Sequence, residues 1–492
     1  MLNPYVSELC YVPLDAVDSI SHLKKSLTLL DYDMFSGESK SIECFSLAKK
    51  GYIGIPRTIG QKSLSDKFNF EDKTVINSKS SFDSQVIAAM CGAIKARNPE
   101  QQEFMNDLEL LCANHTQSPI DFIANASTGS GKSVTMLWLI ARLPLPALIV
   151  VPTIKLMHQF LGSIERENGM RYFFGEDFVN DYVGIVQQDT CDYVGKYIVV
   201  ASMCSLAQRY YGKQFYENFS VVFFDEVHKT AAPQMQRVLS KFPARIRGGF
   251  TATNKKGDLK KICEFHLGTP KAISTQEQMA PNVYIYTYKR MVRLFGSSDS
   301  QKLASLCMLK DRNSVIANIV YERGYLRKRN IVILSDKVKQ LQNIQQLLID
   351  KGIDKKDVGL YVGAYYPKTP KGFGTKTIKT LDSELERIAS DCSIILATYA
   401  IFSTGTDIPR LDMGVEASPR TDLVQAIGRI TRLKKNKLTP EWYSLKDVIT
   451  FSVETCGKTM LRYETKYLRQ HKARIKSYLI QKAKIFNVTD NI

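Results

Sequence analysis

Short, mostly apolar runs recur along the chain, each followed by a turn or a helix-like segment. Residues 122–126, 220–224 and 330–335 are runs of this kind. Strands buried on both faces of a parallel sheet have this pattern, because helices cover them from both sides. Residues 134–140, shortly after the first run, have the apolar pattern of a helix. The pattern therefore predicts an α/β fold built on parallel sheets.

A Gly- and Ser-rich turn joins the first run to this helix-like segment. Its glycines allow successive backbone N–H groups to converge on phosphate oxygens at a helix N-terminus. Lys132 can reach the β- and γ-phosphates, and Ser133 can hold Mg²⁺. Ala126 stands where the usual pattern has Gly, and a loop that ends in Lys by chance is the alternative. The predicted phosphate-binding residues are Ala126, Ser127, Thr128, Gly129, Ser130, Gly131, Lys132 and Ser133.

Two acidic residues follow the strand-like run 220–224. Asp225 and Glu226 would stand at the C-terminal end of a buried strand and face the crevice in which such sheets bind ligands. There, Asp225 can hold Mg²⁺ and Glu226 can polarise a water molecule. A solvated acidic turn is the alternative. Together with the phosphate loop, the pair predicts nucleotide hydrolysis.

These motifs, with others downstream, resemble those of the superfamily 2 helicases in their DExH branch. The phosphate loop and residues 225–228 and 251–253 are similar to motifs I, II and III. Residues 403–407 and 425–432 are similar to motifs V and VI, and all five occur in the family's order. The resemblance implies two tandem RecA-like lobes that close on ATP and Mg²⁺ and reopen after hydrolysis.

Motif VI carries the second set of candidate catalytic residues. Gln425, Arg429 and Arg432 are spaced four and three residues apart, so a helix would present them on one face. Two guanidinium groups suit an arginine-finger role at the γ-phosphate. An exposed basic helix end is the alternative, because lysines follow at once. The resemblance implies that Lys132, Asp225, Glu226, Gln425, Arg429 and Arg432 are catalytic. It also implies nucleotide contacts from Gly405 and Asp407, and coupling to the nucleic acid through His228, Thr251 and Thr253.

Small side chains after several predicted strands are candidates for nucleic-acid contacts. Hydroxyl groups there suit the phosphate backbone, which positions a nucleic acid without reading its sequence. Each is equally suited to cap the helix that follows. The resemblance implies that Pro152, Thr153, Ser202, Thr398 and Thr404 make these contacts.

A glutamine ahead of motif I reads adenine in this family, and three residues compete for the role. Gln85 begins the helix-like segment 86–95, whereas Gln101 and Gln102 begin another. A position at a helix start suits either segment. Gln85 is the preferred assignment, and an ordinary exposed helix residue is the alternative for each.

The motif positions predict four parts of the chain. They are an accessory domain at 1–80, lobes at 81–270 and 271–455, and a basic C-terminal segment at 456–492. The accessory domain carries no helicase motif, and its short apolar runs and turns predict a small α/β or mostly β fold.

The C-terminal segment concentrates the positive charge of the chain. Of the formal net charge of +18, residues 458–484 hold nine Lys and Arg against Glu464 alone, whereas charges balance in residues 1–80. Apolar residues such as Leu461, Leu468 and Ile475 recur at near-helical spacing, with tyrosines between them. A basic amphipathic helix is predicted, which binds phosphates, docks on the second lobe, or does both.

Composition argues against other classes of site. Ten cysteines without a C-x-x-C pair indicate reduced thiols in a cytosolic protein, so no metal beyond Mg²⁺ is expected. The longest apolar stretch, 136–151, is broken by Arg142 and two prolines, and the N-terminus lacks a signal-peptide pattern. No membrane partner is expected.

Residues 397–405 are similar to the corresponding stretch of UvsW-like phage helicases, whose layout also fits. The resemblance covers about residues 82–485. It implies a DNA helicase, by default monomeric, that works on branched DNA in replication, recombination or repair in the host cytoplasm. Fork regression, Holliday junction branch migration and R-loop removal are the implied reactions. An RNA-directed or transcript-release ATPase, a restriction-type translocase subunit and a non-enzymatic nucleic-acid-binding scaffold stay open.

Overall fold

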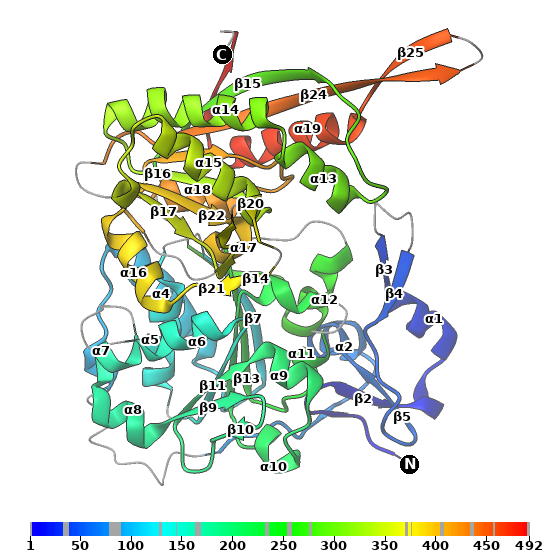
Figure 1. Cartoon of the computed structure of the whole chain (residues 1–492). Coiled ribbons are helices and arrows are strands. Elements are labelled where there is room, and N and C mark those ends of the chain that lie inside the picture. The colour runs from blue at the N-terminus through cyan, green and yellow to red at the C-terminus, as the bar shows by residue number, and fades with distance from the viewer. Residues whose placement is uncertain are drawn as a thin grey trace. The chain divides into compact units, whose positions relative to one another are not determined.

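A computed structural model describes residues 2–32, 39–77, 90–126, 130–143, 145–162, 169–231, 236–252, 258–274, 278–369, 372–374, 376–403, 408–432, 437–455 and 458–489. The chain forms two compact units, Met1–Gln276 and Glu277–Ile492 (Figure 1). Each contains a mostly parallel sheet covered by helices, which confirms the predicted α/β fold with two RecA-like lobes. No helix in the described ranges is long and apolar enough to cross a membrane.

The large sheet of the first unit has the strand order β10-β9-β11-β8-β12-β13-β7-β14. Among the described strands, neighbours run parallel except β10, which is antiparallel to β9. Phe250 of β13 aligns with Asp225 of β12 and Ala124 of β7, so the C-terminal ends of β7 and β12 share one edge. The strands are β7 Ile120–Ala126, β8 Ala147–Val151, β9 Val183–Gln187, β10 Thr190–Cys191, β11 Ile198–Ser202, β12 Val221–Asp225, β13 Ile246–Thr251 and β14 Pro270–Ser274.

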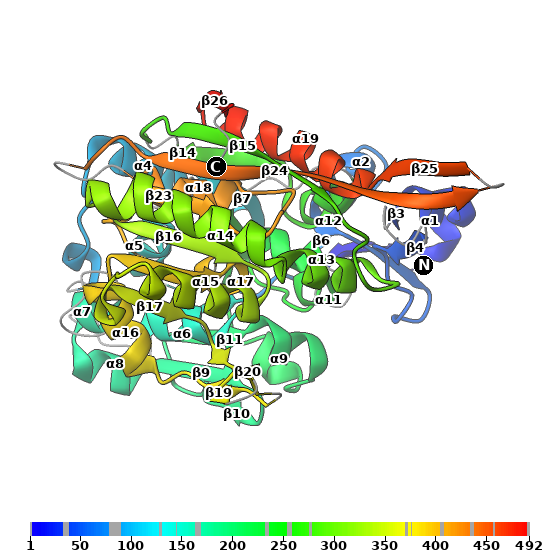
Figure 2. The same ribbon diagram turned by 45° about the horizontal axis from the view of Figure 1, so that its top comes forward.

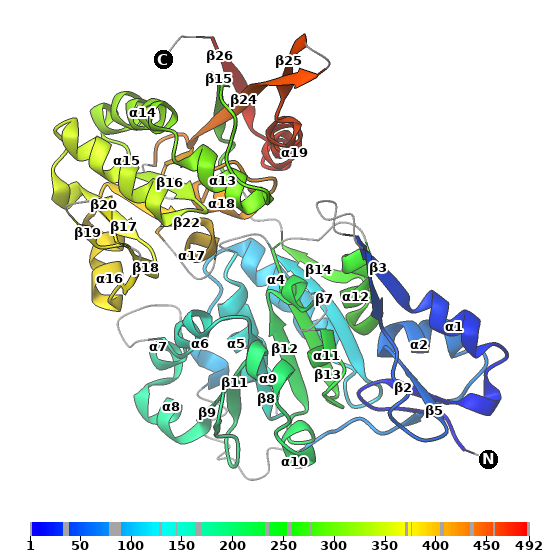
Figure 3. The same ribbon diagram turned by 45° about the vertical axis from the view of Figure 1, so that its right-hand side comes forward.

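Helices bury both faces of this sheet (Figure 3). One apolar core includes side chains of α4, α5 and α6, and the other includes side chains of α9, α11 and α12. Each fully buried Val, Leu, Ile or Phe contributes about 1.5–3 kcal/mol, so the strands hold their shared edge firmly. The helices are α4 Pro99–Cys112, α5 Lys132–Arg142, α6 Ile154–Leu161, α7 Met170–Phe174, α8 Glu176–Tyr182, α9 Met203–Gln208, α10 Lys213–Tyr216, α11 Gln236–Leu239 and α12 Asp258–Leu267.

The N-terminal residues form a small sheet of order β5-β2-β1-β6 and a separate β3–β4 hairpin. Arg57 of this region and Arg247 of β13 both donate hydrogen bonds to the carboxylate of Asp121 in β7, at 2.8–3.2 Å, and all three are buried. This region therefore packs onto the large sheet within one compact unit. Its elements are β1 Tyr5–Val6, β2 Cys10–Pro13, α1 Ile20–Ser26, β3 Thr28–Tyr32, β4 Ser39–Glu43, β5 Tyr52–Ile55, α2 Arg57–Leu64 and β6 Glu71–Asp72.

The sheet of the second unit has the order β17-β22-β16-β23-β24-β15-β26, and β25 pairs with β24. Within the described residues, only β25 runs antiparallel to its neighbour in this sheet. The strands are β15 Asn282–Met291, β16 Ile331–Ser335, β17 Val358–Tyr361, β22 Ile394–Thr398, β23 Met413–Glu416, β24 Glu441–Thr455, β25 Lys458–Tyr463 and β26 Lys484–Val488. Two short hairpins stand beside it, β18 Ala364–Tyr365 with β21 Ile378–Lys379 and β19 Lys368–Thr369 with β20 Gly372–Phe373.

Helices again cover both faces, with α14 and α15 on one side and α19 on the other (Figures 2 and 3). One core joins residues of α14 and α15 to the sheet, and the second joins residues of α16, α18 and the end of α19. The helices are α13 Asp299–Cys307, α14 Lys310–Ile319, α15 Val338–Asp350, α16 Asp382–Asp391, α17 Tyr399–Ser403, α18 Val424–Ile430 and α19 Thr465–Ile480.

The basic C-terminal segment differs in part from its prediction. A helix is present in α19, but Leu461 lies in strand β25, and β26 adds an edge strand after the helix. The helical assignment of Leu461 is wrong because β24 continues past the sheet and the chain returns along it as β25. In α19, Tyr467, Arg474 and Tyr478 are buried, so the helix docks on the second lobe and leaves its opposite face to solvent.

Candidate active site

The phosphate-binding turn lies between β7 and α5, as predicted. β7 ends at Ala126 and α5 begins at Lys132, while residues 127–129 lie outside the described residues. Gly131 has φ of 83°, a backbone conformation that is strained for a residue with a side chain, and a Cβ there would lie 2.3 Å from Nε2 of Gln101. The ammonium group of Lys132 donates to the carbonyl of Ala126 at 3.3 Å. Helix α5 therefore begins with its positive end at this turn.

The acidic pair stands where the sequence predicts it, at the end of β12. Asp225 is 3% exposed, and the backbone N–H of Glu226 donates to its Oδ1 at 2.9 Å. Glu226 has φ of 48°, a costly backbone conformation for a residue with a side chain. In this conformation its Oε1 lies 3.9 Å from Nζ of Lys132. The motif II carboxylate and the motif I lysine are thus brought together from different strand ends.

The two carboxyl groups have opposite electrostatic environments. Burial, reinforced by the charge of Glu226, raises the pKa of Asp225 to about 7. Burial also acts to raise the pKa of Glu226, but Lys132 and His228 outweigh it and lower that pKa to about 2. Glu226 is therefore ionised at neutral pH, and a cation at Asp225 would favour its ionised form as well.

The donor set suits a nucleotide with Mg²⁺. Asp225 and Ser133 offer the hard oxygen atoms that Mg²⁺ prefers. Within the described part of the chain, the hydroxyl of Ser130 is buried without a hydrogen-bond partner, beside the turn that would hold phosphates. These residues fit a magnesium nucleotide.

A line of contacts leads from the acidic pair to motif III. Nδ1 of His228 lies 3.2 Å from Oε2 of Glu226 and 2.9 Å from Oγ1 of Thr251, the last residue of β13. Thr253 lies outside the described residues. Lys132, Glu226, His228 and Thr251 thus form one chain of polar contacts across three elements.

Of the two candidate glutamines that the structure describes, Gln101 lies beside the phosphate turn. Its side chain is buried against Gly131, and its Oε1 accepts from the backbone N–H of Arg97 at 3.0 Å. Gln102 is exposed and donates to Asn106. Gln85 lies outside the described residues. Both helix starts carry the same signal in the sequence, and the assignment of Gln85 stays a prediction.

The predicted nucleic-acid contacts lie at C-terminal strand ends. Pro152 and Thr153 follow β8, while Ser202 and Thr398 end β11 and β22. Oγ1 of Thr153 accepts from the backbone N–H of Leu156 at 3.3 Å, so this residue does cap α6. Ser202 is buried and makes no capping hydrogen bond. Thr404 lies outside the described residues, as do Gly405 and Asp407 of motif V.

Motif VI is only partly helical. Gln425 and Arg429 lie on α18, which ends at Ile430, and Arg432 lies beyond it. The prediction that one helix face carries all three is therefore wrong for Arg432. The chain leaves the helix because Thr431 and Arg432 pair with residues before β15: the Thr431 carbonyl accepts from the N–H of Met279 at 2.9 Å. The guanidinium of Arg429 lies 5.7 Å from the ring centre of Phe402.

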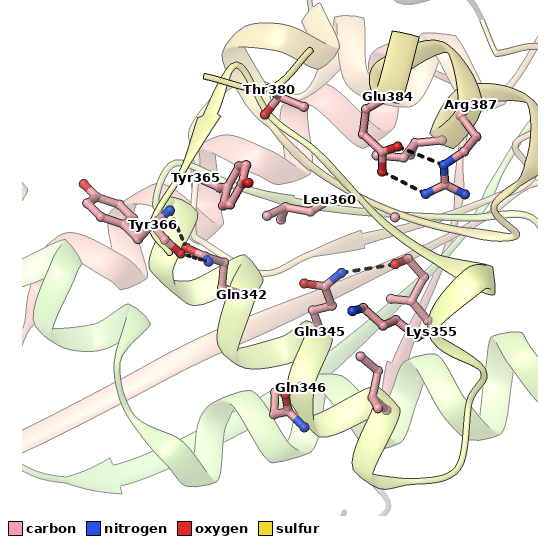
Figure 4. A pocket seen from close by; sticks show the side chains of 14 residues that line it. Gln342, Gln345, Gln346, Lys355, Leu360, Tyr365, Tyr366, Thr380, Glu384 and Arg387 are labelled. Atoms are coloured by element: carbon pink, nitrogen blue, oxygen red, sulfur yellow. Dashed lines mark hydrogen bonds and ion pairs between the residues drawn. The ribbon is translucent and has the colours of Figure 1, made fainter. Parts of the chain in front are cut away.

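A pocket of about 450 Å³ lies elsewhere in the second unit, between α15, β17 and α16 (Figure 4). Gln342 donates to the carbonyl of Tyr366 and accepts from its N–H, and Glu384 pairs with Arg387 at 2.8 Å. None of the motif residues that the structure describes in this unit lines the pocket. Its glutamine side chains bond to the backbone of neighbouring segments, as Gln345 does by donating to the carbonyl of Val358 in β17.

Comparisons with known proteins agree with this architecture. Residues 94–256 match the family described as type III restriction enzyme, res subunit. A putative ATP-dependent RNA helicase of Acanthamoeba polyphaga mimivirus is 25% identical over 371 residues, which are 72% of this chain and 65% of that protein. The chain therefore spans slightly less than two thirds of that relative.

The fold is shared with a solved structure of an RNA-bound protein. Mss116p bound to single-stranded RNA and AMP-PNP aligns with 86% of this chain and 81% of its own, at 14% identity and a TM-score of 0.52. T4 UvsW aligns over 99% of both chains at 15% identity and a TM-score of 0.36. The matched region 94–256, the viral relative and the shared fold support the resemblance to superfamily 2 helicases.

Proposed function

We propose that this chain is a superfamily 2 helicase, an ATP-dependent motor that unwinds or remodels branched DNA. The observation that carries the proposal is the chain of contacts from Lys132 through Glu226 and His228 to Thr251. It connects the phosphate-binding turn to the end of β13. A motor requires such a connection, because hydrolysis must alter the surface that grips the nucleic acid.

Hydrolysis would use the residues gathered at the shared edge of the first sheet. Lys132, Ser133 and Asp225 would hold ATP and Mg²⁺, and the bound ion would neutralise charge on the phosphates. Glu226 would orient and polarise the attacking water through its ionised carboxylate. Its pKa of about 2 keeps it ionised for this task at neutral pH.

The second unit would supply positive charge to the reaction. Arg429 and Arg432, with Gln425 beside them in motif VI, would stabilise the charge that develops on the γ-phosphate. Gly405 and Asp407 remain predicted nucleotide contacts. Because one chain carries both sets of motif residues, we propose a monomer as the working form.

We propose that Gln101 reads the adenine base instead of Gln85. It is buried, and its amide lies at Gly131, the residue before α5, whereas Gln102 is exposed. An amide can donate to and accept from the edge of adenine, which gives preference for ATP.

Branched DNA is the proposed substrate for two reasons. Residues 397–405 are similar to the UvsW-like phage helicases, and the net charge of +18 favours a polyanion. Pro152, Thr153, Ser202, Thr398 and Thr404 would contact the phosphate backbone. The implied setting is viral replication, recombination or repair in the host cytoplasm.

The proposal is tested by strand displacement on labelled substrates. A four-way DNA junction, a forked DNA duplex and an RNA duplex of the same sequence are each incubated with the full chain and ATP, with Lys132→Ala as control. Unwinding or branch migration of the DNA substrates, absent in the control, is expected. Activity on the RNA duplex alone would contradict DNA as the substrate.

An RNA-directed ATPase is the second candidate. The observation that favours it is the mimivirus relative, which is named a putative ATP-dependent RNA helicase. The same experiment separates the two when the RNA substrate is a fork of the same layout as the forked DNA, because 2′-hydroxyl groups are then the main feature that distinguishes RNA from DNA.

A further inference from the structure

A two-stranded ribbon projects from the sheet of the second unit (Figures 1 and 3). β24 pairs with β15 up to the pair Thr450–Met291, and beyond it pairs only with β25. Among the described residues, neither strand has a partner on its outer edge in this stretch. We call residues 451–455 and 458–463 the ribbon.

The ribbon exposes large apolar side chains on both faces. Leu461 and Tyr463 lie opposite Ser452 and Thr450 on one face, and Met460 lies opposite Val453 on the other. Tyr463 is 52% exposed, Leu461 54% and Met460 51%. An isolated two-stranded ribbon is at best marginally stable in water, and exposed apolar groups add no burial energy. The exposed apolar side chains of the ribbon therefore do not serve to stabilise the second unit.

The surface next to the ribbon is cationic. Arg462 on the ribbon and Arg469, Lys472 and Lys476 on the exposed face of α19 have no acidic partner among the described residues. Glu464, the one acidic residue in 458–484, is already paired with Lys302 at 3.0 Å. The excess charge therefore faces solvent and is complementary to a polyanion.

We propose that the ribbon is the element that opens base pairs, and that the exposed face of α19 holds the duplex backbone. This inference rests on the proposed helicase function. Apolar side chains that enter a base step unstack it, and aromatic rings stack on the freed bases. Cations three and four residues apart on a helix fit successive phosphates. A protein partner or a second copy would need acidic groups for these four cations, so a nucleic-acid duplex is the favoured occupant.

The test replaces the apolar side chains of the ribbon in the full chain. Met460→Ser, Leu461→Ser and Tyr463→Ser are combined, and the matched control combines Leu326→Ser, Ile378→Ser and Leu381→Ser, which are 60%, 47% and 71% exposed in other parts of the unit. We expect the ribbon variant to unwind forked DNA about tenfold more slowly, with ATP hydrolysis on single-stranded DNA unchanged. The control variant should match the wild type in both assays.

A second variant tests the helix. Combined replacement of Arg469, Lys472 and Lys476 by Gln should weaken duplex binding and lower the slope of log affinity against log salt by about 2–3. An unchanged salt slope would overturn the role of α19.

Three results would overturn the role of the ribbon. Unwinding equal to that of the wild type would refute it directly. A parallel loss of ATP hydrolysis on single-stranded DNA would show that the ribbon serves the motor fold. A change in oligomeric state with unwinding intact would assign the ribbon to self-association. If the wild type unwinds no duplex, the proposed function fails together with this inference, whereas the other results leave that function standing.

Discussion

In both units a buried arginine attaches a terminal element to the sheet. The two arginines bind at opposite ends of their strands. In the first unit, Arg57 of the N-terminal region binds Asp121, near the start of the strand whose other end carries Ala126 of the phosphate turn. In the second, Arg474 of α19 binds Glu416, at the end of β23.

The C-terminal helix also reaches motif VI directly. The backbone N–H of Leu423 donates to Oγ of Ser477 at 3.2 Å, and Gln481 donates to the carbonyl of Val424 at 3.3 Å. Tyr478 shares its apolar core with residues of α18. The Arg57–Asp121 contact should therefore affect the stability of the first unit alone. The contacts of α19 should affect both the stability of the second unit and the position of α18.

The largest expected effect comes from Asp121→Asn. Two buried guanidinium groups, Arg57 and Arg247, would lose their shared counter-charge, so the free energy of unfolding of the first unit should fall by about 3–5 kcal/mol. Trp138 and Trp442 stand in different units, so urea unfolding followed by Trp138 fluorescence in a Trp442→Phe background reports the first unit.

The pH dependence of the wild type provides a check on this prediction. Burial acts to raise the pKa of Asp121, but Arg247 and Arg57 outweigh it and lower that pKa. Its contribution to stability is therefore present above the unfolded pKa of about 4 and is lost as pH falls through the lower folded value. If Trp442 fluorescence reports an equal loss of unfolding free energy in Asp121→Asn, the Arg57–Asp121–Arg247 cluster does not stabilise the first unit alone.

Arg474→Met should have the next largest effect, about 3 kcal/mol in the second unit. The substitution removes the cation that faces the buried carboxylate of Glu416. The hydroxyl of Ser444 still donates to that carboxylate at 2.9 Å. Burial already raises the pKa of Glu416, and loss of the opposing Arg474 raises it further. The folded variant then binds a proton more tightly than the unfolded chain, so its stability should rise as pH falls through the raised pKa of the folded state. Trp442 fluorescence in a Trp138→Phe background measures this, and a pH-independent loss would contradict it.

Gln101→Ala should raise the KM for ATP about tenfold, equivalent to about 1.4 kcal/mol of binding. It also should reduce the preference for ATP over GTP, since the proposed adenine contact is removed. Gln102→Ala is the matched control, because that side chain is exposed one residue away. Steady-state hydrolysis with both nucleotides provides the measurement, and equal KM values for the two variants would remove Gln101 from the site.

The smallest effect is expected from Ser477→Ala, about 1 kcal/mol for one lost hydrogen bond to α18. Because that helix carries Arg429, kcat for ATP hydrolysis should fall several-fold with stability nearly retained. Ser390→Ala, at the exposed end of α16, serves as the control. If kcat is unchanged, the C-terminal helix does not position motif VI.

The parts of the candidate site that follow buried strands could be predicted from the sequence. Lys132, Asp225 and Thr251 stand at one edge because parallel strands bring their C-terminal ends together. Fully apolar runs mark such strands, and the motifs follow them directly. Local pattern and sheet geometry thus specify the same arrangement.

Features set by distant pairing could not be predicted. Near-helical spacing of Leu461 with Leu468 and Ile475 suggested one helix, but pairing with β24 makes Leu461 part of a strand. Arg432 leaves the helix face because its neighbour Thr431 bonds to Met279, far back in the chain. The Arg57–Asp121–Arg247 cluster joins three separate regions, so no local pattern reveals it.

The central claim, an ATP-driven motor on branched DNA, is tested most directly by phosphate release from ATP. The full chain is assayed without nucleic acid and with a four-way DNA junction or RNA, beside Lys132→Ala and Glu226→Gln. We expect strong stimulation by the junction and its loss in both variants. Absence of hydrolysis under every condition, or stimulation by RNA alone, would contradict it.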